Sequence, residues 1–273
     1  MTRKMIRALV VLVTSMLVVS FFLSGCSQNS NQGTEDSSDE TGIVAGTSNE
    51  NDTSKTESET EKASGREVNE SSLKTYSVVR VDGEPDWGNV PVLDINNQQW
   101  LDPVDISAYA QLCYSDDAFY VRMWAQEEHI RAEYPESDLL ANTYEDSCLE
   151  FFIAPVTGDA RYLNFEFNPN CAVGVQIETT KTDRTRLVRT DNLFNAVSTR
   201  TEDGWEITYC VPFDFIRSFY PEFFVESGMQ LRGNFYKCGN LTEQKHYLSW
   251  NAIESDTPNF HKPECFGVLK LEA

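Results

Sequence analysis

Two carboxylates lie four residues apart in the segment EDSCLEFFI at 145–153, and carboxylate pairs are the usual acid and base of glycosidic-bond cleavage. If this segment is an extended strand, Asp146 and Glu150 share a face at a separation of about 13 Å. A retaining glycosidase holds its two carboxyl groups about 5–5.5 Å apart, and an inverting enzyme about 6.5–9.5 Å apart. The spacing therefore disfavours catalysis by this pair alone and favours structural hydrogen bonding or calcium ligation.

Nucleophilic catalysis has equally little support in the sequence. There is no G-x-S-x-G nucleophile elbow, and the three histidines, His129, His246 and His261, are scattered without an evident serine or cysteine partner. No Cys-x-x-Cys or cysteine–histidine spacing typical of a zinc site is present.

Aromatic rings that alternate with amide, carboxylate and guanidinium groups suit a neutral sugar. The rings stack on its C–H faces, and the polar groups bond its hydroxyls. Asn164 and Glu166 share one predicted strand face, and Arg232, Asn234 and Tyr236 share another. Each of these residues taken alone also fits an ordinary solvated face of a strand.

The elements that carry these residues show the period-2 alternation of half-buried strands. In 119–124, Phe119, Val121 and Met123 share one face, and the residues between them share the other. Turn residues at 115–117 and 202–204 predict two hairpins. The strands expected on these grounds lie at 76–81, 106–114, 119–124, 148–154, 161–168, 172–179, 195–201, 205–209, 230–237, 245–250 and 266–271.

The absence of βαβ alternation predicts an all-β fold for residues 75–273. We expect one antiparallel β-sandwich of about ten strands, of the immunoglobulin or jelly-roll kind. The sequence predicts one short helix near Phe213–Phe219, which begins after Pro212.

Charge and aromatic content divide the chain of 273 residues. The formal net charge is −21, of which residues 75–273 carry −17, and 30 of the 32 aromatic residues lie there. Because phosphate binding needs clustered Lys and Arg, nucleic acid is not an expected partner. The acidic surface suits a neutral polysaccharide and is poorly suited to acidic glycans such as pectate.

Residues 1–25 have the layout of an export signal, with three basic residues before an uncharged apolar run at 8–23. The run ends in Leu23-Ser24-Gly25-Cys26, which resembles the bacterial lipoprotein lipobox and implies cleavage before Cys26 and its lipidation. Two acyl chains give stable anchoring. We therefore expect an exported protein, anchored to the outer side of a bacterial membrane at the cell surface; an ordinary signal peptide or a single membrane anchor is the alternative.

Residues 26–74 comprise the expected lipid-bearing cysteine and an acidic tether rich in Ser, Thr and Asn. Between residues 27 and 74 there are no aromatic residues. Such a segment cannot bury enough apolar surface to offset its ordering entropy, so we expect a disordered spacer.

Six cysteines follow Cys26, and their even number permits three disulfides in an exported chain. Their long spacings and predicted strand positions also suit buried free thiols, which behave as small hydrophobic groups. The sequence leaves both states open.

Six short motifs are distributed over nearly all of 76–271. They are DG at 82–83 with Trp87, DDAFYV at 116–121, EDSCLEFFI at 145–153, RGNFY at 232–236, YLSW at 247–250 and FHKPECFGVL at 260–269. In this order they resemble the motifs of family 9 carbohydrate-binding modules. Each motif is short, and together they point to the family rather than to one sugar.

The resemblance implies a β-sandwich that binds ends or short stretches of plant-type polysaccharide or oligosaccharide. In the family, two tryptophans clamp a sugar ring, and the matching positions here are Tyr144 and Phe260. Glu150 matches a glutamate that bonds sugar hydroxyls, whereas Asn164 and Tyr236 fall near a family Arg and a family Gln. With His261 as an additional polar contact, the expected ligand-binding residues are Tyr144, Glu150, Asn164, Tyr236, Phe260 and His261.

The resemblance further implies a non-catalytic protein, accessory to glycoside hydrolases, with no cofactor other than a structural calcium whose ligands the sequence does not reveal. Two alternatives remain: glycoside hydrolysis by this chain, and haem binding, because related sandwiches hold haem through Met, His or Lys. The possible haem ligands are Met123, Met229, His246 and His261. An adhesion or assembly module that binds a protein partner is a further reading.

Overall fold

The structure, a computed structural model, describes residues 73–188 and 191–273. The predicted export signal, Cys26 and nearly all of the predicted tether therefore lie outside the described residues. No helix in the described part of the chain is long and apolar enough to cross a membrane.

The described residues form fourteen strands and one short α-helix, α1 (Phe213–Arg217), which begins after Pro212 as expected. The long predicted strands are present within a few residues of their expected bounds. Three strands of two or three residues, β2, β3 and β9, are additional, because so short a segment shows no alternation. The strands are β1 (Thr75–Arg80), β2 (Leu93–Asp94), β3 (Asn97–Gln98), β4 (Ser107–Tyr114), β5 (Ala118–Gln126), β6 (Cys148–Ala154), β7 (Tyr162–Phe167), β8 (Val173–Glu178), β9 (Arg184–Arg186), β10 (Val197–Arg200), β11 (Gly204–Pro212), β12 (Gln230–Gly239), β13 (His246–Ser249) and β14 (Gly267–Leu271).

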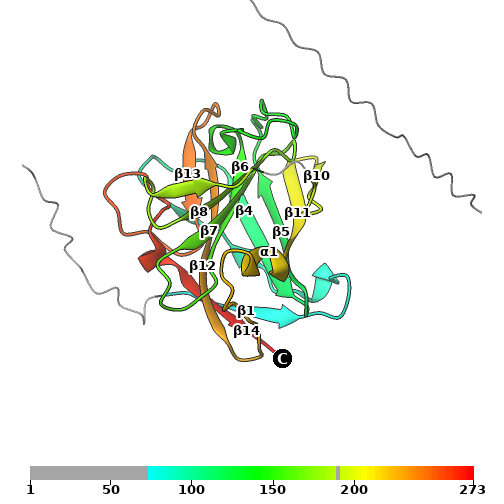
Figure 1. Ribbon diagram of the computed structural model, residues 1–273. Helices are drawn as coiled ribbons and strands as arrows, with labels where there is room; N and C mark the ends of the chain where they lie inside the picture. Colours follow the sequence, from blue (N-terminus) through cyan, green and yellow to red (C-terminus); the bar gives the residue numbers. More distant parts are fainter. Residues whose placement is uncertain (1–72, 189–190) are drawn as a thin grey trace, which may run out of the picture. The chain divides into compact units, whose positions relative to one another are not determined.

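Two sheets share strand β1 (Figure 1). One has the order β10-β11-β5-β4-β1, and the other the order β1-β14-β12-β6-β7-β8-β9, with β13 paired to β12 and to β3. The two predicted hairpins are confirmed as β4–β5 and β10–β11.

The predicted all-β sandwich is confirmed, but it departs in two details from a purely antiparallel arrangement of about ten strands. Strand β1 runs parallel to β14 through Thr75–Val78 and parallel to β4 through Val79 and Arg80, so the sheet is mixed. The strands also number more than ten. Alternation along a sequence shows which side chains share a face, but it contains no information on the direction of the neighbouring strand.

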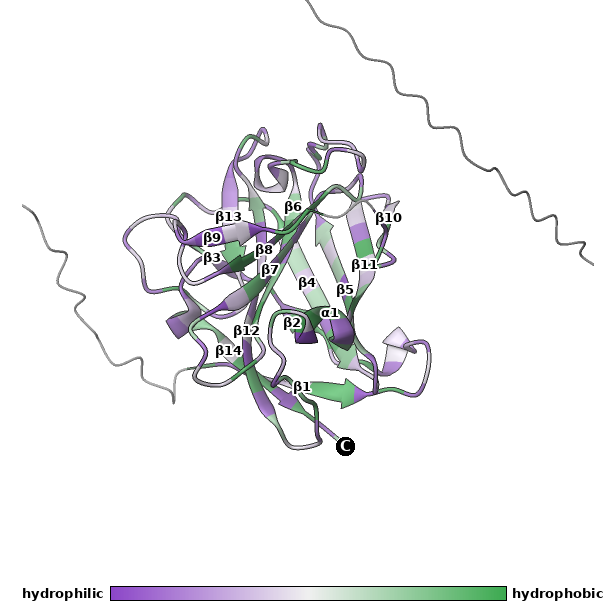
Figure 2. Cartoon of the chain, viewed as in Figure 1, coloured by the Kyte–Doolittle hydropathy of each residue, from purple (hydrophilic) through white to green (hydrophobic). Residues whose placement is uncertain are grey.

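The main core lies between the two sheets, and the predicted face of β5 enters it. Phe119, Val121 and Met123 are at most 1% exposed. Helix α1 adds Phe213, Phe215 and Ile216 to the same core. Figure 2 shows hydrophobic residues along strands such as β1 and β6.

A second apolar cluster covers the opposite face of the β12-β6-β7 sheet. Its covering residues come from the segment 253–266, between β13 and β14. As a result, β6 and β7 are buried on both faces along nearly their whole length. The cluster comprises Cys148, Phe152, Tyr162, Tyr236, Cys238, Ile253, Phe260, Cys265 and Phe266. We call this covered side the outer face of the sheet, and the side toward the main core the inner face.

Candidate functional site

A pocket of about 300 Å³ opens on the outer face of the sheet. Strands β6, β7 and β12 contribute Glu150, Glu166 and Cys238 to its lining. Strand β13, the β8–β9 hairpin, a 3₁₀ turn and loops supply the remainder. The other lining residues are Tyr144, Lys181, Arg184, Asn240, Tyr247, Pro258, Asn259, Phe260 and His261.

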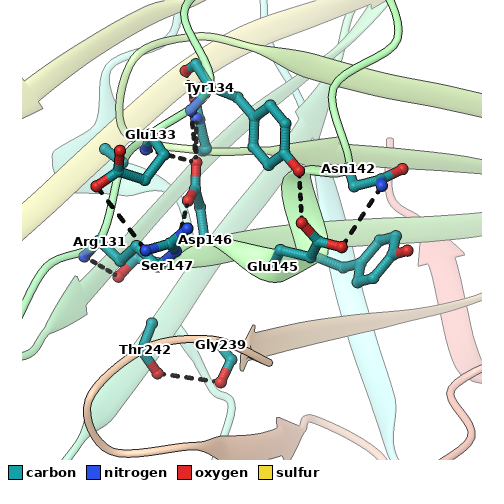
Figure 3. A network of polar contacts seen from close by, with 12 residues as sticks. Arg131, Glu133, Tyr134, Asn142, Glu145, Asp146, Ser147, Gly239 and Thr242 are labelled. Atoms are coloured by element: carbon teal, nitrogen blue, oxygen red, sulfur yellow. Dashed lines mark hydrogen bonds and ion pairs between the residues drawn. The ribbon is translucent and has the colours of Figure 1, made fainter.

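Tyr144 reaches the pocket from a single 3₁₀ turn, Thr143–Glu145, just before β6. Figure 3 shows Tyr134 and Asn142 converging on Glu145 of this turn: the Tyr134 hydroxyl donates to Glu145 Oε2 at 2.5 Å. The loop after β12 also holds the turn, because Asn240 N donates to the carbonyl of Tyr144. These contacts fix the ring position from several directions.

Asp146 supports this region and does not line the pocket. Its carboxylate is completely buried, forms an ion pair with Arg131 Nε at 3.2 Å, and accepts bonds from the backbone N–H groups of Glu133 and Tyr134 (Figure 3). Asn168 Nδ2 donates to it as well. Asp146 is thus used for structural hydrogen bonding, as the spacing of the two carboxylates favoured.

Phe260 is held by three other aromatic rings. It stacks on Tyr236 with ring centroids 4.2 Å apart and an interplanar angle of 11°, and it meets Trp100 and Tyr247 at about 6 Å. Phe260 is 8% exposed, whereas Tyr236 is fully buried and donates its hydroxyl to the Phe260 carbonyl. Tyr236 therefore supports Phe260 from behind and does not line the pocket.

His261 lies within a chain of buried polar groups. Its Nδ1 is 2.6 Å from Glu178 Oε2, and the Tyr162 hydroxyl donates to the same carboxylate oxygen at 2.8 Å. The carboxylate therefore orients the imidazole.

Asn164 lies one layer behind the pocket, fully buried, and contacts a lining residue rather than the pocket itself. Its Nδ2 donates to Glu166 Oε1 at 2.8 Å, and Thr143 Oγ1 donates to Glu166 Oε2 at 3.0 Å. The Asn164 Oδ1 atom has no hydrogen-bond partner among the described residues. Glu166 is in this way fixed with both oxygens engaged.

Two carboxylates lie side by side in the lining, because Glu150 of β6 pairs in register with Glu166 of β7. Burial raises the pKa of Glu150 well above its ordinary value, and the neighbouring Cys238 and Glu166 raise it further. Burial also raises the pKa of Glu166, although the hydrogen bond from Asn164 opposes this. The pocket thus offers carboxyl groups that are poorly solvated and ready to bond a ligand.

Four of the six predicted ligand-binding residues line one pocket: Tyr144, Glu150, Phe260 and His261. The other two, Asn164 and Tyr236, stand directly behind it. The sequence also singled out Glu166, but it did not associate Lys181, Arg184, Asn240 or Cys238 with a site, since no motif marks them. Only the folding of distant loops brings these residues together.

Haem and calcium, the two cofactors considered from the sequence, fit the described residues less well than a sugar does. His261 lines the pocket, but the other possible haem ligands do not. Met123 is fully buried in the main core, and His246 already has both ring nitrogens bonded, Nε2 to Lys237 Nζ and Nδ1 to the Gln244 carbonyl. In the described part of the chain, the one close group of three His, Cys, Asp or Glu ligands contains two thiols, which does not suit calcium. The calcium therefore stays a prediction.

All six domain cysteines are free thiols in the structure. They are Cys113, Cys148, Cys171, Cys210, Cys238 and Cys265. Of the two states that the sequence left open, the structure has the reduced one.

A β-sandwich with a pocket of aromatic rings and carboxyl groups is typical of carbohydrate-binding modules. The sequence profile of carbohydrate-binding family 9 matches residues 86–271, and the chain belongs to that family. No curated protein matches the chain.

Solved structures share the fold. A candidate carbohydrate-binding protein from Bacteroides uniformis is 25% identical, with a TM-score of 0.64, over 74% of this chain and 100% of that one. A family 9 module from Caldicellulosiruptor kristjanssonii in complex with cellotriose is 16% identical, with a TM-score of 0.52, over 73% of this chain and 94% of that one. The same module in complex with glucose gives the same identity and TM-score, and 96% of it is covered.

Proposed function

We propose that this chain is a surface-anchored lipoprotein that binds neutral plant-type polysaccharide or oligosaccharide and assists glycoside hydrolases. The observation that carries the proposal is the convergence of Tyr144, Phe260, Glu150 and His261 on one pocket of a family 9 domain. The neighbouring module from Caldicellulosiruptor is complexed with cellotriose and with glucose, which favours a glucan-type ligand.

The chemistry of the pocket matches the proposal. The aromatic rings of Tyr144 and Phe260 provide surfaces on which the C–H face of a pyranose can pack. The carboxyl groups of Glu150 and Glu166 and the imidazole of His261 provide bonds to hydroxyls. Because these groups are buried or half-buried and already oriented, little ordering entropy is lost on binding.

Isothermal titration of the full chain in detergent, against gluco-, xylo- and manno-oligosaccharides, tests this function. We expect heat with at least one series. Tyr144→Ala should weaken binding by at least tenfold, about 1.4 kcal/mol, because it removes a ring that lines the pocket. Tyr109→Ala is the matched control, since Tyr109 stacks on Trp124 in the other sheet. Absence of heat with every series, or equal losses in the two variants, would refute the proposal.

Anchoring through Cys26 is a separate part of the proposal. It rests on the basic residues, the apolar run and the Leu-Ser-Gly-Cys ending at residues 3–26. Metabolic labelling with a fatty acid should mark the wild-type chain and leave Cys26→Ser unlabelled and unprocessed. A Cys26→Ser chain that is still labelled would exclude lipidation at this residue.

Catalysis by this chain is the competing function, and the Glu150–Glu166 pair is the observation in its favour. Both carboxyl groups lie on neighbouring strands of one face, whereas a glycosidase places its two groups on either side of the scissile bond. Release of reducing sugar that is abolished by Glu150→Gln would establish catalysis. We expect binding without release.

A further inference from the structure

Two cysteines and a glutamate meet on the outer face of the sheet. Cys148 of β6 faces Cys238 of β12 in the strand register, and Glu150 follows Cys148 by two residues, on the same face. The three potential ligand atoms, two sulfurs and a carboxylate oxygen, all lie within 4.8 Å of one another. The Cys238 thiol donates to Glu150 Oε1 at 2.9 Å.

This donor set matches a particular class of metal ion. Calcium and magnesium prefer oxygen ligands, whereas zinc and other borderline-soft cations take thiolates together with a carboxylate. Ligand atoms around a tetrahedral zinc lie roughly 3.3–3.8 Å from one another, as follows from bond lengths near 2.0–2.3 Å. A triangle with edges of at most 4.8 Å therefore needs a contraction of only about 1 Å along its longest edge.

The three groups are held on rigid elements and yet can be reached. Cys148, Glu150 and Cys238 are each at most 3% exposed, and all three come from paired strands. Glu150 and Cys238 line the pocket, so an ion can enter from it. The same pocket gives room for a fourth ligand, either water or a hydroxyl group of a bound molecule.

We propose that Cys148, Glu150 and Cys238 form a binding site for a thiophilic divalent cation, with zinc as the ion that fits best. Binding displaces the two thiol protons to solvent, and the cation is held by two thiolates and one carboxylate. The fourth position faces the pocket and stays exchangeable, as in zinc sites with three protein ligands. The site requires neither lipidation nor a bound sugar, although it shares Glu150 and Cys238 with the sugar pocket.

Cobalt(II) titration of the reduced full chain tests the site, because cobalt–thiolate coordination gives a charge-transfer absorption that other ligands do not. All samples carry Cys26→Ser, so that the thiol of residue 26 does not contribute. We expect one cobalt ion per chain and its displacement by zinc. Cys148→Ser and Cys238→Ser should each weaken the absorption and lower affinity by more than about tenfold. Cys265→Ser is the matched control, a buried cysteine of the same cluster.

Glu150→Gln is a second test in case the serine variants misfold, because it keeps the shape of the side chain and removes only its charge. This variant should retain the thiolate absorption and lose affinity for cobalt. The absence of charge-transfer absorption in the folded reduced protein would overturn the site. An absorption that survives Cys238→Ser and disappears in Cys265→Ser would overturn it as well.

Discussion

The two faces of strand β6 are both buried, but they differ in chemistry. The inner face presents Leu149, Phe151 and Ile153 to the main core, which is a large cluster of buried hydrophobic residues. The outer face alternates with it and presents Cys148, Glu150 and Phe152. One strand therefore supplies both part of a hydrophobic core and the base of a pocket. Burial alone does not identify a core face.

The polar groups of the outer face are tolerated because they bond one another. Glu166 accepts from Asn164 and from Thr143, and Glu178 accepts from Tyr162. Aromatic rings fill the space between these groups, as in the Phe152–Tyr162 stack with ring centroids 5.8 Å apart. Such a face stabilises the sheet and also keeps polar atoms available for a ligand.

The largest effect on stability is expected from removing either of the two phenylalanine rings at the centre of β6. Phe151→Ala and Phe152→Ala should each lower the free energy of unfolding by about 3–5 kcal/mol, because each removes a ring that is fully buried. Only Phe152→Ala should also weaken sugar binding, since Phe152 contacts Tyr236 and His261. Urea unfolding and titration calorimetry measure the two effects.

Phe224→Ser serves as the control for this pair, since Phe224 is 54% exposed and should change stability by no more than about 0.5 kcal/mol. If Phe152→Ala left the free energy of unfolding unchanged, the outer face would not be a packed cluster.

The next largest expected effect is on the pH dependence of stability, and it involves a buried polar group at the end of the inner face. His246 accepts a bond from Lys237 Nζ, which also pairs with Glu127 at 3.2 Å, and the whole group is buried. Burial, together with the positive charge of Lys237, lowers the pKa of His246 to about 3. In the unfolded chain, His246 takes up a proton near pH 6.5, whereas in the folded chain it stays neutral at this pH.

Because the unfolded state binds the additional proton, stability from His246 is complete above pH 6.5 and is lost as pH falls toward 3. The loss should approach about 1.4 kcal/mol per pH unit at most. His246→Gln should show a shallower decrease in the free energy of unfolding over this range. Equal slopes for the two proteins, measured by urea unfolding at several pH values, would contradict this assignment.

The smallest effect is expected from a variant that enlarges the aromatic ring of Tyr144 instead of removing it. Tyr144→Trp should tighten sugar binding by roughly threefold, about 0.7 kcal/mol, because indole offers a larger apolar surface. Tyr109→Trp, at the other sheet, should leave affinity unchanged. A loss of affinity in Tyr144→Trp would mean that Tyr144 contacts the sugar through its hydroxyl rather than its ring face.

Much of the candidate site could be predicted, because short motifs contain Glu150, Phe260 and His261, and Tyr144 directly precedes the motif at 145–153. The role of Tyr236 could not, since alternation places it on a polar-looking face but does not reveal that Phe260 covers it. The contact of Glu178 with His261 could not be predicted either. It faces His261 only because the segment before β14 folds over β8.

The local structure of this protein follows from its amino-acid sequence. Period-2 alternation and turn residues specify the long strands and the two hairpins, and the β5 residues Phe119, Val121 and Met123 specify a face of the core. These are local properties, because the side-chain direction in a strand follows from the backbone alone.

Which faces are buried, and which polar groups meet, depends on the tertiary structure. Strand β1 joins two sheets in parallel, and β6 and β12 bring Cys148 opposite Cys238 although they are 90 residues apart. Residues from 253–266 then close the outer face and turn a strand surface into a pocket. The physical reason is that burial and pairing depend on contacts between distant segments, and no local pattern of side chains records them.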